Sequence, residues 1–337
     1  MLDNLIRFKY TLVQCAALLL FVVLLPACDK SVKPTQVDRP AFNSDSAYAY
    51  VEKQLAFGPR VPNSKAHMDC AVWLIQELCR HGAVVELQKG TMPDYSGRVQ
   101  QVINIIGHFR PAATLNSQLS TIILCAHYDT RAWCDEEPIY EDRFYNVPGA
   151  NDGASGVAVL LEVARQFAAD SARLKQPVDI VFFDYEDQGT PRTYTGVQRE
   201  DTWCLGSQMF AQQYLSAENN TAYHFGILLD MVGAPDAVFP RELYSTQYAQ
   251  NYQELIWRIA HTLGYGRYFV DKASYPITDD HYYLNKAGIP CVDIIHYDSH
   301  NSSGFASWWH TRQDDIHNVD KTTLQAVGEV ILATVQR

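Results

Sequence analysis

The chain has 337 residues, of which 47% are hydrophobic and 19% are charged, so it holds enough apolar material for one large packed domain or two small ones. Its formal net charge is −11 at pH 7, and Lys and Arg form no dense run. Because phosphate binding needs a basic surface, these numbers exclude nucleic acid as an expected partner.

The first 28 residues have the layout of an export signal. Two basic residues are followed by an apolar stretch over residues 11–27. The Leu-Pro-Ala-Cys segment at 25–28 resembles the lipobox of bacterial lipoproteins, although its proline is less usual at that position. We predict that residues 1–27 are a lipoprotein signal peptide and that lipidated Cys28 anchors an exported chain to a bacterial cell membrane, periplasmic or surface-facing. A plain signal peptide and an uncleaved anchor are the alternatives, and both also place the rest of the chain outside the cytoplasm.

The next segment has the character of a linker. Residues 28–42 are polar and contain proline, as expected of a tether before a catalytic domain over residues 43–337. A helical pattern starts with that domain and stops at Gly58. Ser64 can cap a second helix, and Gly82 can end it.

Beyond residue 82 the chain alternates between short β-type runs and helical patterns. Several of the strands are apolar on both faces, which predicts a single α/β domain with a central, mixed and mostly parallel sheet flanked by helices. The predicted strands are 102–106, 121–125, 178–183, 225–232 and 289–295. The predicted helices are 156–169, 205–215, 252–263 and 321–335.

Titratable residues follow four of these strands, at or after the point where each strand ends. In open α/β sheets the functional crevice lies outside the carboxyl ends of the strands, so residues far apart in sequence can converge there. These residues are His127 and Asp129, the run Asp184-Tyr185-Glu186-Asp187, Asp230 and, after a longer loop, His310.

A glycine-rich loop at 148–156 precedes one predicted helix and carries Asp152. Asp152 is either a helix cap or a residue aimed into the crevice. A catalytic zinc site has three protein ligands and one open position, and Asp152, Asp187 and His310 can supply the three. Glu186, beside Asp187, would then lie close to the ion without binding it, as a general base requires.

The same segments carry a family resemblance that covers residues 43–337. They are similar to the zinc-dependent aminopeptidase superfamily and, within it, to the animal-type glutaminyl-peptide cyclotransferases with their bacterial members. The similar segments are FGPRVPNS (57–64), AHYD (126–129), PGANDGASG (148–156), FFDYED (182–187), LLDMVGAPDAVFP (228–240), TDDHYYLNKAGIPCVDII (278–295) and WHT (309–311). The resemblance implies an aminopeptidase-like α/β sandwich.

The resemblance also implies roles for particular residues. One zinc ion per chain is expected on Asp152, Asp187 and His310, with Glu186 as the proton shuttle. Asp187 departs from the animal pattern, which has Glu there; either carboxylate can bind zinc, and the shorter one has less reach.

Other residues match positions around the family's active site. Asp230 and Asp279 are expected in its hydrogen-bond network. Trp309 and Phe305 match aromatic residues that line the substrate pocket, and Trp203 matches another pocket tryptophan at a longer spacing than in animal members.

The implied reaction converts the N-terminal glutamine of peptides and proteins to pyroglutamate, with release of ammonia. A two-zinc aminopeptidase is the alternative, since His127 and Asp230 stand where the superfamily binds its second ion. A catalytically inactive binding domain is a third reading, which would need a broken metal set.

Six cysteines follow Cys28. Four lie in apolar segments and are expected to be buried thiols: Cys70, Cys79, Cys125 and Cys291. Cys134 and Cys204 lie in polar loops of an exported chain, and the sequence leaves open whether they form a disulfide.

Overall fold

The computed structural model describes residues 41–111, 120–171, 174–216 and 222–336. Residues 39–337 form one compact unit. The predicted signal peptide, the lipidation site Cys28 and nearly all of the tether lie outside the described residues. Among the residues that are described, no helix has both the length and the apolar character needed to cross a membrane.

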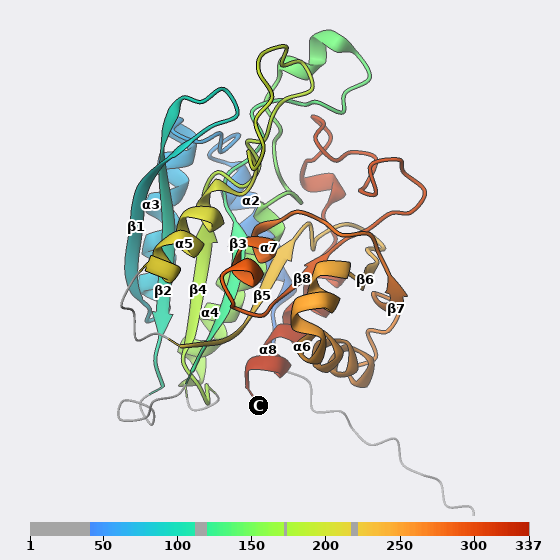
Figure 1. Cartoon of the computed structure of the whole chain (residues 1–337). Helices are drawn as coiled ribbons and strands as arrows, with labels where there is room; N and C mark the ends of the chain where they lie inside the picture. The colour runs from blue at the N-terminus through green and yellow to red at the C-terminus, as the bar shows by residue number, and fades with distance from the viewer. Residues whose placement is uncertain (1–40, 112–119, 172–173, 217–221, 337) are drawn as a thin grey trace, which may run out of the picture. The chain divides into compact units, whose positions relative to one another are not determined.

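A six-stranded sheet runs through the described unit in the order β1-β2-β4-β3-β5-β8 (Figure 1). β2 is antiparallel to both of its neighbours, whereas β4, β3, β5 and β8 are parallel to one another. The carboxyl ends of these four strands therefore share one edge of the sheet. The strands are β1 (Val84–Pro93), β2 (Val99–Phe109), β3 (Thr121–His127), β4 (Val178–Phe183), β5 (Tyr223–Asp230) and β8 (Cys291–Ile295).

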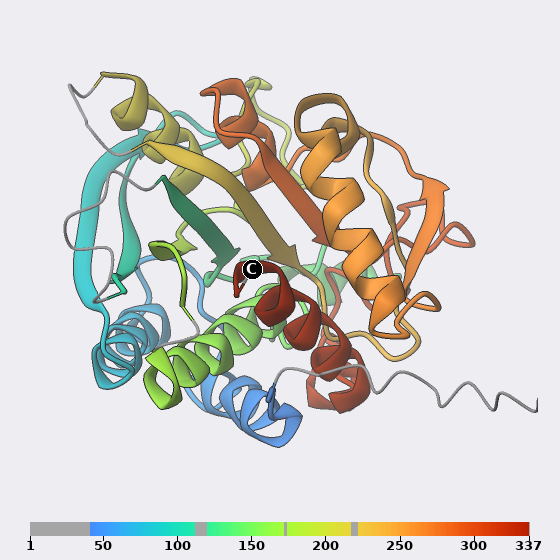
Figure 2. The same ribbon diagram turned by 90° about the horizontal axis from the view of Figure 1, so that it is seen from below.

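Helices cover both faces of this sheet, as the view from below shows (Figure 2). The helices α2, α3, α4 and α8, with α6 beside β8, lie on one face, and the shorter α5 and α7 lie on the other. Their bounds are α2 (Ser44–Leu55), α3 (Lys65–Arg80), α4 (Ala154–Ala169), α5 (Leu205–Ser216), α6 (Leu243–Thr262), α7 (Asp280–Lys286) and α8 (Lys321–Val335). The 3-10 turns η2 (Tyr140–Phe144) and η4 (Ile316–Asn318) and a second, two-stranded sheet of β6 (Phe239–Arg241) and β7 (Phe269–Ala273) complete the described elements.

The central strands are apolar on both faces because each face packs against helices. In β3, Ile122 and Leu124 belong to the core that includes α4, whereas Ile123 and Cys125 belong to the core under α5 and α7. All four side chains are fully buried. A parallel strand covered on both sides reads as a continuous apolar run rather than an alternation.

The fold class expected from the sequence is confirmed, and most element bounds agree with it. β4 and α8 have the predicted bounds, and α4 and α5 differ from theirs by one or two residues. Ser64 caps α3 by accepting a hydrogen bond from the backbone nitrogen of His67 at 3.2 Å. Gly82 follows that helix in the left-handed region, at φ 88°.

Three strands and one helix were not predicted from the sequence, and each omission has a physical reason. β1 is an edge strand with polar residues exposed on both sides, so it shows no apolar alternation. β6, β7 and α7 are three, five and seven residues long, too short to show a period. α6 starts at Leu243, nine residues before the predicted start, and has a non-helical residue at Ala249 in its polar first half.

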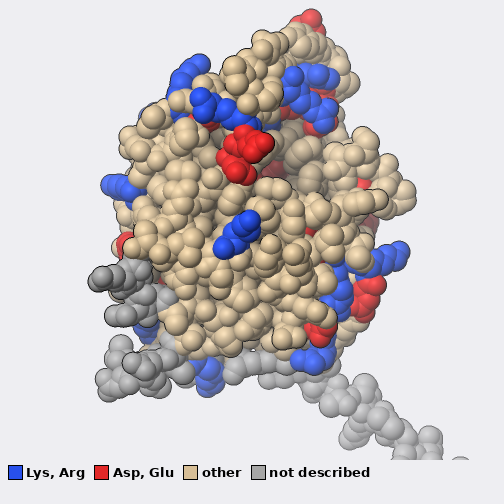
Figure 3. Space-filling view, viewed as in Figure 1, with Lys and Arg blue, Asp and Glu red and all other residues tan. Residues whose placement is uncertain are grey.

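Charged residues are unevenly placed on the face seen in Figure 3. Most of that face carries neither Lys or Arg nor Asp or Glu, and acidic residues lie beside a hollow in its upper part.

Candidate metal and active site

The strand ends bring the predicted site residues to one edge of the sheet. His127 is the last residue of β3 and Asp230 the last of β5. Glu186 and Asp187 lie in the turn after β4, and Asp152 lies in the loop that leads into α4. All of these side chains are buried, as is His310, which comes from the loop before η4.

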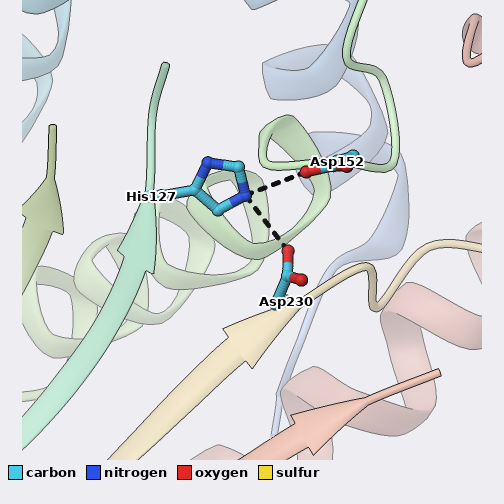
Figure 4. Close-up of side chains that lie close together, drawn as sticks. All are labelled: His127, Asp152 and Asp230. Atoms are coloured by element: carbon cyan, nitrogen blue, oxygen red, sulfur yellow. Dashed lines mark hydrogen bonds and ion pairs between the residues drawn. The ribbon is translucent and has the colours of Figure 1, made fainter. Parts of the chain in front are cut away.

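One cluster joins a histidine to two aspartates (Figure 4). Nε2 of His127 lies 3.1 Å from Oδ1 of Asp152 and 3.1 Å from Oδ1 of Asp230. The imidazole points from the end of β3 toward both carboxylates, one on the loop and one at the end of β5. The three residues each offer an atom, and those atoms all lie within 4.8 Å of one another.

A second cluster shares Asp152 with the first. Nε2 of His310 lies 3.0 Å from Oδ1 of Asp187 and 3.5 Å from Oδ2 of Asp152. Ligand atoms of these three residues also lie within 4.8 Å of one another. Asp152 therefore presents one carboxylate oxygen to each histidine, which is an arrangement that can hold one ion or bridge two.

The loop that carries Asp152 needs glycine for its path. Gly149 has φ +72°, and a Cβ there would lie 2.1 Å from the Thr130 side chain. A Cβ on Gly153 would lie 2.5 Å from the backbone oxygen of His127. The Asp152–Gly153 peptide bond is cis. The two glycines therefore allow the loop to lie directly against the end of β3.

Two buried side chains hold this loop in place. The Oδ1 and Oδ2 atoms of Asp314 accept hydrogen bonds from the backbone nitrogens of Asn151 (2.8 Å) and Asp152 (3.1 Å). Arg60 donates to the backbone oxygens of Pro148 and Gly149, each at 2.6 Å. Asp314 and Arg60 were not singled out from the sequence, since nothing in its local pattern marks a residue that acts on a distant loop.

The turn after β4 is fixed by Asp129. Its carboxylate accepts hydrogen bonds from the backbone nitrogens of Glu186 (3.0 Å) and Asp187 (3.2 Å) and from Nε2 of Gln188 (3.1 Å). Asp129 is fully buried. It was identified from the sequence only as a strand-end residue, and the structure shows it positioning the turn.

Backbone strain accompanies the site. Tyr185, Met231 and His310 all have positive φ angles, of 56°, 48° and 53°. A non-glycine residue in this region costs about 1–3 kcal/mol and persists where its surroundings enforce it. His310 belongs to a cluster, Met231 directly follows Asp230, and Tyr185 directly precedes the Glu186-Asp187 pair.

Glu186 lies beside the clusters rather than in them. Its Oε2 is 4.0 Å from Nδ1 of His127, and its Oε1 accepts a hydrogen bond from the Cys204 thiol at 3.2 Å. Atoms of Glu186, Cys204 and Asp279 lie within 4.8 Å of one another. Burial and the neighbouring Asp279 charge raise the Glu186 pKa well above its ordinary value, despite the opposing effect of His127.

The surrounding acids and histidines shift one another's pKa values. Burial lowers the pKa of His127, but the neighbouring carboxylates of Asp129, Asp152 and Asp230 outweigh this effect and raise it well above its usual value. Burial raises the pKa of Asp230 to about 6, and burial with the Asp230 charge raises that of Asp279 to about 7. Several carboxylates thus lie close together around two histidines, His127 and His310.

The residues fit a zinc ion. The donors are carboxylate oxygens and imidazole nitrogens, which zinc prefers together with thiolates. Oδ2 of Asp187 is buried and accepts no hydrogen bond among the described residues. A buried polar atom without a partner is costly, and a bound cation at this position would satisfy it.

A cavity of about 950 Å³ opens onto the clusters, and its lining includes three of the predicted aromatic residues, Trp203, Phe305 and Trp309. The Trp203 ring stacks parallel to the His310 ring, with centroids 6.1 Å apart and an interplanar angle of 8°. The Trp309 ring stacks on the His310 ring, with centroids 3.6 Å apart, and its centroid lies 4.6 Å from that of Phe305. Behind Trp203, the buried Arg131 lies 4.5 Å from its ring and donates to the backbone oxygen of Asp187. Arg131 was not predicted.

The cysteine expectations are only partly met. Cys70, Cys125 and Cys291 are buried free thiols, but Cys79 is exposed because it falls on the solvent side of α3. Cys134 and Cys204 are both buried and both free. No disulfide therefore joins them in this structure.

Known proteins resemble this chain over most of its length. The model of peptidase family M28 matches residues 104–335. The structure of Tannerella forsythia glutaminyl cyclase is 45% identical, covers 88% of this chain and 99% of its own, and has a TM-score of 0.83. A Zn-dependent exopeptidase from Parabacteroides distasonis is 42% identical, covers 89% of this chain and 100% of its own, and also has a TM-score of 0.83.

A more distant relative is the glutaminyl-peptide cyclotransferase of Boiga irregularis. It is 27% identical over an alignment of 254 residues, and the alignment covers 68% of this chain and 63% of the relative's own length. The family match and the buried zinc-type clusters agree with each other. This chain belongs to peptidase family M28.

Proposed function

We propose that this protein is a zinc-dependent glutaminyl cyclase that converts N-terminal glutamine of peptides and proteins to pyroglutamate. The observation that carries the proposal is the cluster of Asp152, Asp187 and His310 with Glu186 poised beside it and aromatic rings around the cavity. Support also comes from the similarity over 88% of the chain to a bacterial glutaminyl cyclase.

Zinc would be held by Asp152, Asp187 and His310, and when bound it polarises the substrate's γ-carbonyl as a Lewis acid. In the reaction the α-amine attacks that carbonyl, a carbon–nitrogen bond closes the ring, and the bond to the side-chain nitrogen breaks. Glu186 takes the excess proton from the attacking amine and delivers it to the departing nitrogen, which leaves as ammonia. The α-amine has a pKa of about 7.7–8.0, so a large part of it is neutral near neutral pH.

The remaining residues position the reactants. Trp309 and Phe305 would hold glutamine in the folded-back shape that brings its amine to its own side chain, and Trp203 would support His310 from its other face. Asp230 and Asp279 would complete the hydrogen-bond network around Glu186.

A two-zinc aminopeptidase is the second candidate, and a specific observation favours keeping it. Asp152 offers one oxygen to each histidine, and His127, Asp152 and Asp230 form a second ligand group with the same spread of atoms. An M28 relative of 42% identity is described as a Zn-dependent exopeptidase.

One assay separates the two candidates. The purified full-length protein, loaded with zinc, is given peptides that begin with Gln and matched peptides that begin with Leu. Ammonia release from the Gln peptides alone supports the cyclase. Release of free Leu or Gln supports the aminopeptidase and overturns the cyclase proposal. Metal analysis should give one zinc per chain for the cyclase and two for the aminopeptidase.

The ligand set is tested on its own by His310→Ala. This change removes a nitrogen donor, so zinc content after dialysis should fall well below one per chain, while His224→Gln, at an exposed histidine near the opposite end of β5 from Asp230, should keep it. Full zinc occupancy in His310→Ala would remove His310 from the ligand set.

We also propose that Cys28 is lipidated and holds the enzyme at a bacterial cell membrane. The lipobox-like segment 25–28 supports this proposal. Cells grown with a labelled fatty acid should yield labelled wild-type protein in the membrane fraction. Cys28→Ser should be unlabelled, and label on that variant would contradict the assignment.

A further inference from the structure

The cavity that holds the site has an inner part and a mouth. Asp152, Asp187 and His310 are buried at its inner end, whereas Asp201 and Tyr275 line the same cavity and are exposed. Its volume of about 950 Å³ lies at the upper end of the range for pockets that bind drug-sized ligands. A single glutamine fills only a fraction of that space, so the residues that follow it in a substrate would lie in the mouth.

Charged side chains that line the cavity are almost all of one sign, negative. Among the described residues that line the cavity, the titratable side chains other than His310 and the tyrosines are all carboxylic acids, and none is Lys or Arg. The inner carboxylates lie beside the two histidines, which offset their charge. Among the described residues no cation forms an ion pair with Asp201, which is exposed.

Asp201 is held in a defined position. Its Oδ1 accepts a hydrogen bond from the Tyr283 hydroxyl at 3.3 Å, and its backbone oxygen accepts one from Nε2 of Gln208 at 2.8 Å. Its φ is 52°, in the left-handed region. The carboxylate is thus anchored to α5 and α7 rather than carried on a free loop end.

Tyrosine rings line the same cavity as Asp201. Tyr275 is 74% exposed, which is unusual for so large a side chain, and its ring centroid lies 6.3 Å from that of Tyr297. Both tyrosines line the cavity, as does Tyr283. Aromatic faces attract ammonium and guanidinium groups. The Asp201 carboxylate, which lines the same cavity and accepts the hydrogen bond from the Tyr283 hydroxyl, adds to that attraction.

We propose that Asp201, with Tyr275 and Tyr297, makes the enzyme select substrates with Lys or Arg directly after the N-terminal glutamine and disfavour Asp or Glu there. This inference rests on the proposed cyclase function and names the peptides that the same site takes. Because the mouth is exposed to solvent, the effect is modest: about three- to tenfold in kcat/KM for a cationic over a neutral residue of the same shape.

The test uses C-terminally amidated peptides that differ only in the second residue. Gln-Lys, Gln-acetyllysine and Gln-Glu peptides are compared by ammonia release, so that Lys and acetyllysine differ in charge but little in shape. We expect kcat/KM in the order Lys, acetyllysine, Glu, with a ratio of Lys to acetyllysine that shrinks at high salt.

Asp201→Asn should bring the Lys to acetyllysine ratio close to one, and Asp201→Lys should place Glu above Lys. Glu200→Gln removes the same charge one residue away, at a side chain that does not line the cavity, and should keep most of the ratio. Equal rates for the three peptides in the wild type, or a preference that survives in Asp201→Asn, would overturn this inference and leave the cyclase function standing. Ammonia release from none of them would overturn both.

Discussion

Two of the buried groups of histidine and aspartate among the described residues differ in how well their polar atoms are satisfied. In the first, Nε2 of His67 lies 2.9 Å from Oδ1 of Asp184, and Oδ2 of Asp184 accepts a hydrogen bond from the backbone nitrogen of Ile103. Nδ1 of His67 pairs with the backbone nitrogen of Asn63, and the ring stacks on Tyr128 at 4.8 Å. Every polar atom of this pair has a partner.

The second group is the pair of clusters at the strand ends. It contains more carboxylates than cations, it leaves Oδ2 of Asp187 and Nδ1 of His127 without hydrogen bonds among the described residues, and it opens onto a large cavity. Burial alone therefore does not mark a functional histidine. The distinguishing features are polar atoms without hydrogen-bond partners and access to a cavity. In a stabilising pair every polar atom is hydrogen-bonded, whereas a binding site needs polar atoms that are free to contact its ligand.

The largest expected effect is a loss of turnover caused by a substitution beside the second group. Glu186→Gln keeps the shape of the side chain but cannot move a proton, so ammonia release from Gln peptides should fall about 10²- to 10⁴-fold. Zinc content and the melting temperature should stay near the wild-type values. An active Glu186→Gln enzyme would refute the proton-shuttle role.

The next effect separates the two groups. Asp184→Ala leaves His67 buried without its partner, and loss of one member of a buried pair costs about 3–5 kcal/mol of folding free energy. Urea or thermal unfolding measures the loss, with Asp69→Ala on exposed α3 surface as the control. Zinc affinity of the folded fraction should not change; a large drop in that affinity would blur the distinction between the two groups.

A smaller effect is expected where a residue acts on the zinc ligand from behind. Asp314→Asn weakens the hold on the backbone nitrogens of Asn151 and Asp152, so zinc affinity should fall about 10- to 100-fold, the range typical for partners of metal ligands. Competition with a chelator measures the change. Asp315→Asn, which alters the neighbouring exposed cap of η4, is the control, and equal affinities in the two variants would contradict a positioning role for Asp314.

The smallest effect is expected at the start of α3, the helix that carries His67 and none of the residues of the second group. Ser64→Ala removes the cap of α3, which should cost about 1 kcal/mol of folding free energy and leave kcat/KM unchanged. Ser64→Asp retains an acceptor and should recover the loss in the same unfolding experiment. A cap variant that altered turnover would show that α3 is coupled to the site and would contradict the expected independence of the two groups.

Local sequence alone determined those helices and strands whose apolar residues form a clear pattern, and it also determined where some of them end. The apolar runs of β3, β4 and β5 identify central strands because both faces are covered, and Ser64 and Gly82 mark the ends of α3 by their own backbone and side-chain chemistry. The parallel order of these strands places their carboxyl ends together, so the sequence alone predicts His127, Glu186 and Asp230 at one edge of the sheet.

Tertiary structure alone decided the finer arrangement. Three features depend on distant chain segments meeting in space: Asp152 offers an oxygen to each of two histidines, Asp314 and Asp129 hold the two ligand loops, and Asp201 lines the cavity. The hydrogen bond from the backbone nitrogen of Asn151 to Asp314, for example, joins residues 163 positions apart. A sequence pattern reports what one segment prefers by itself. Hydrogen bonds, distances and pKa shifts between segments arise only when packing brings them together.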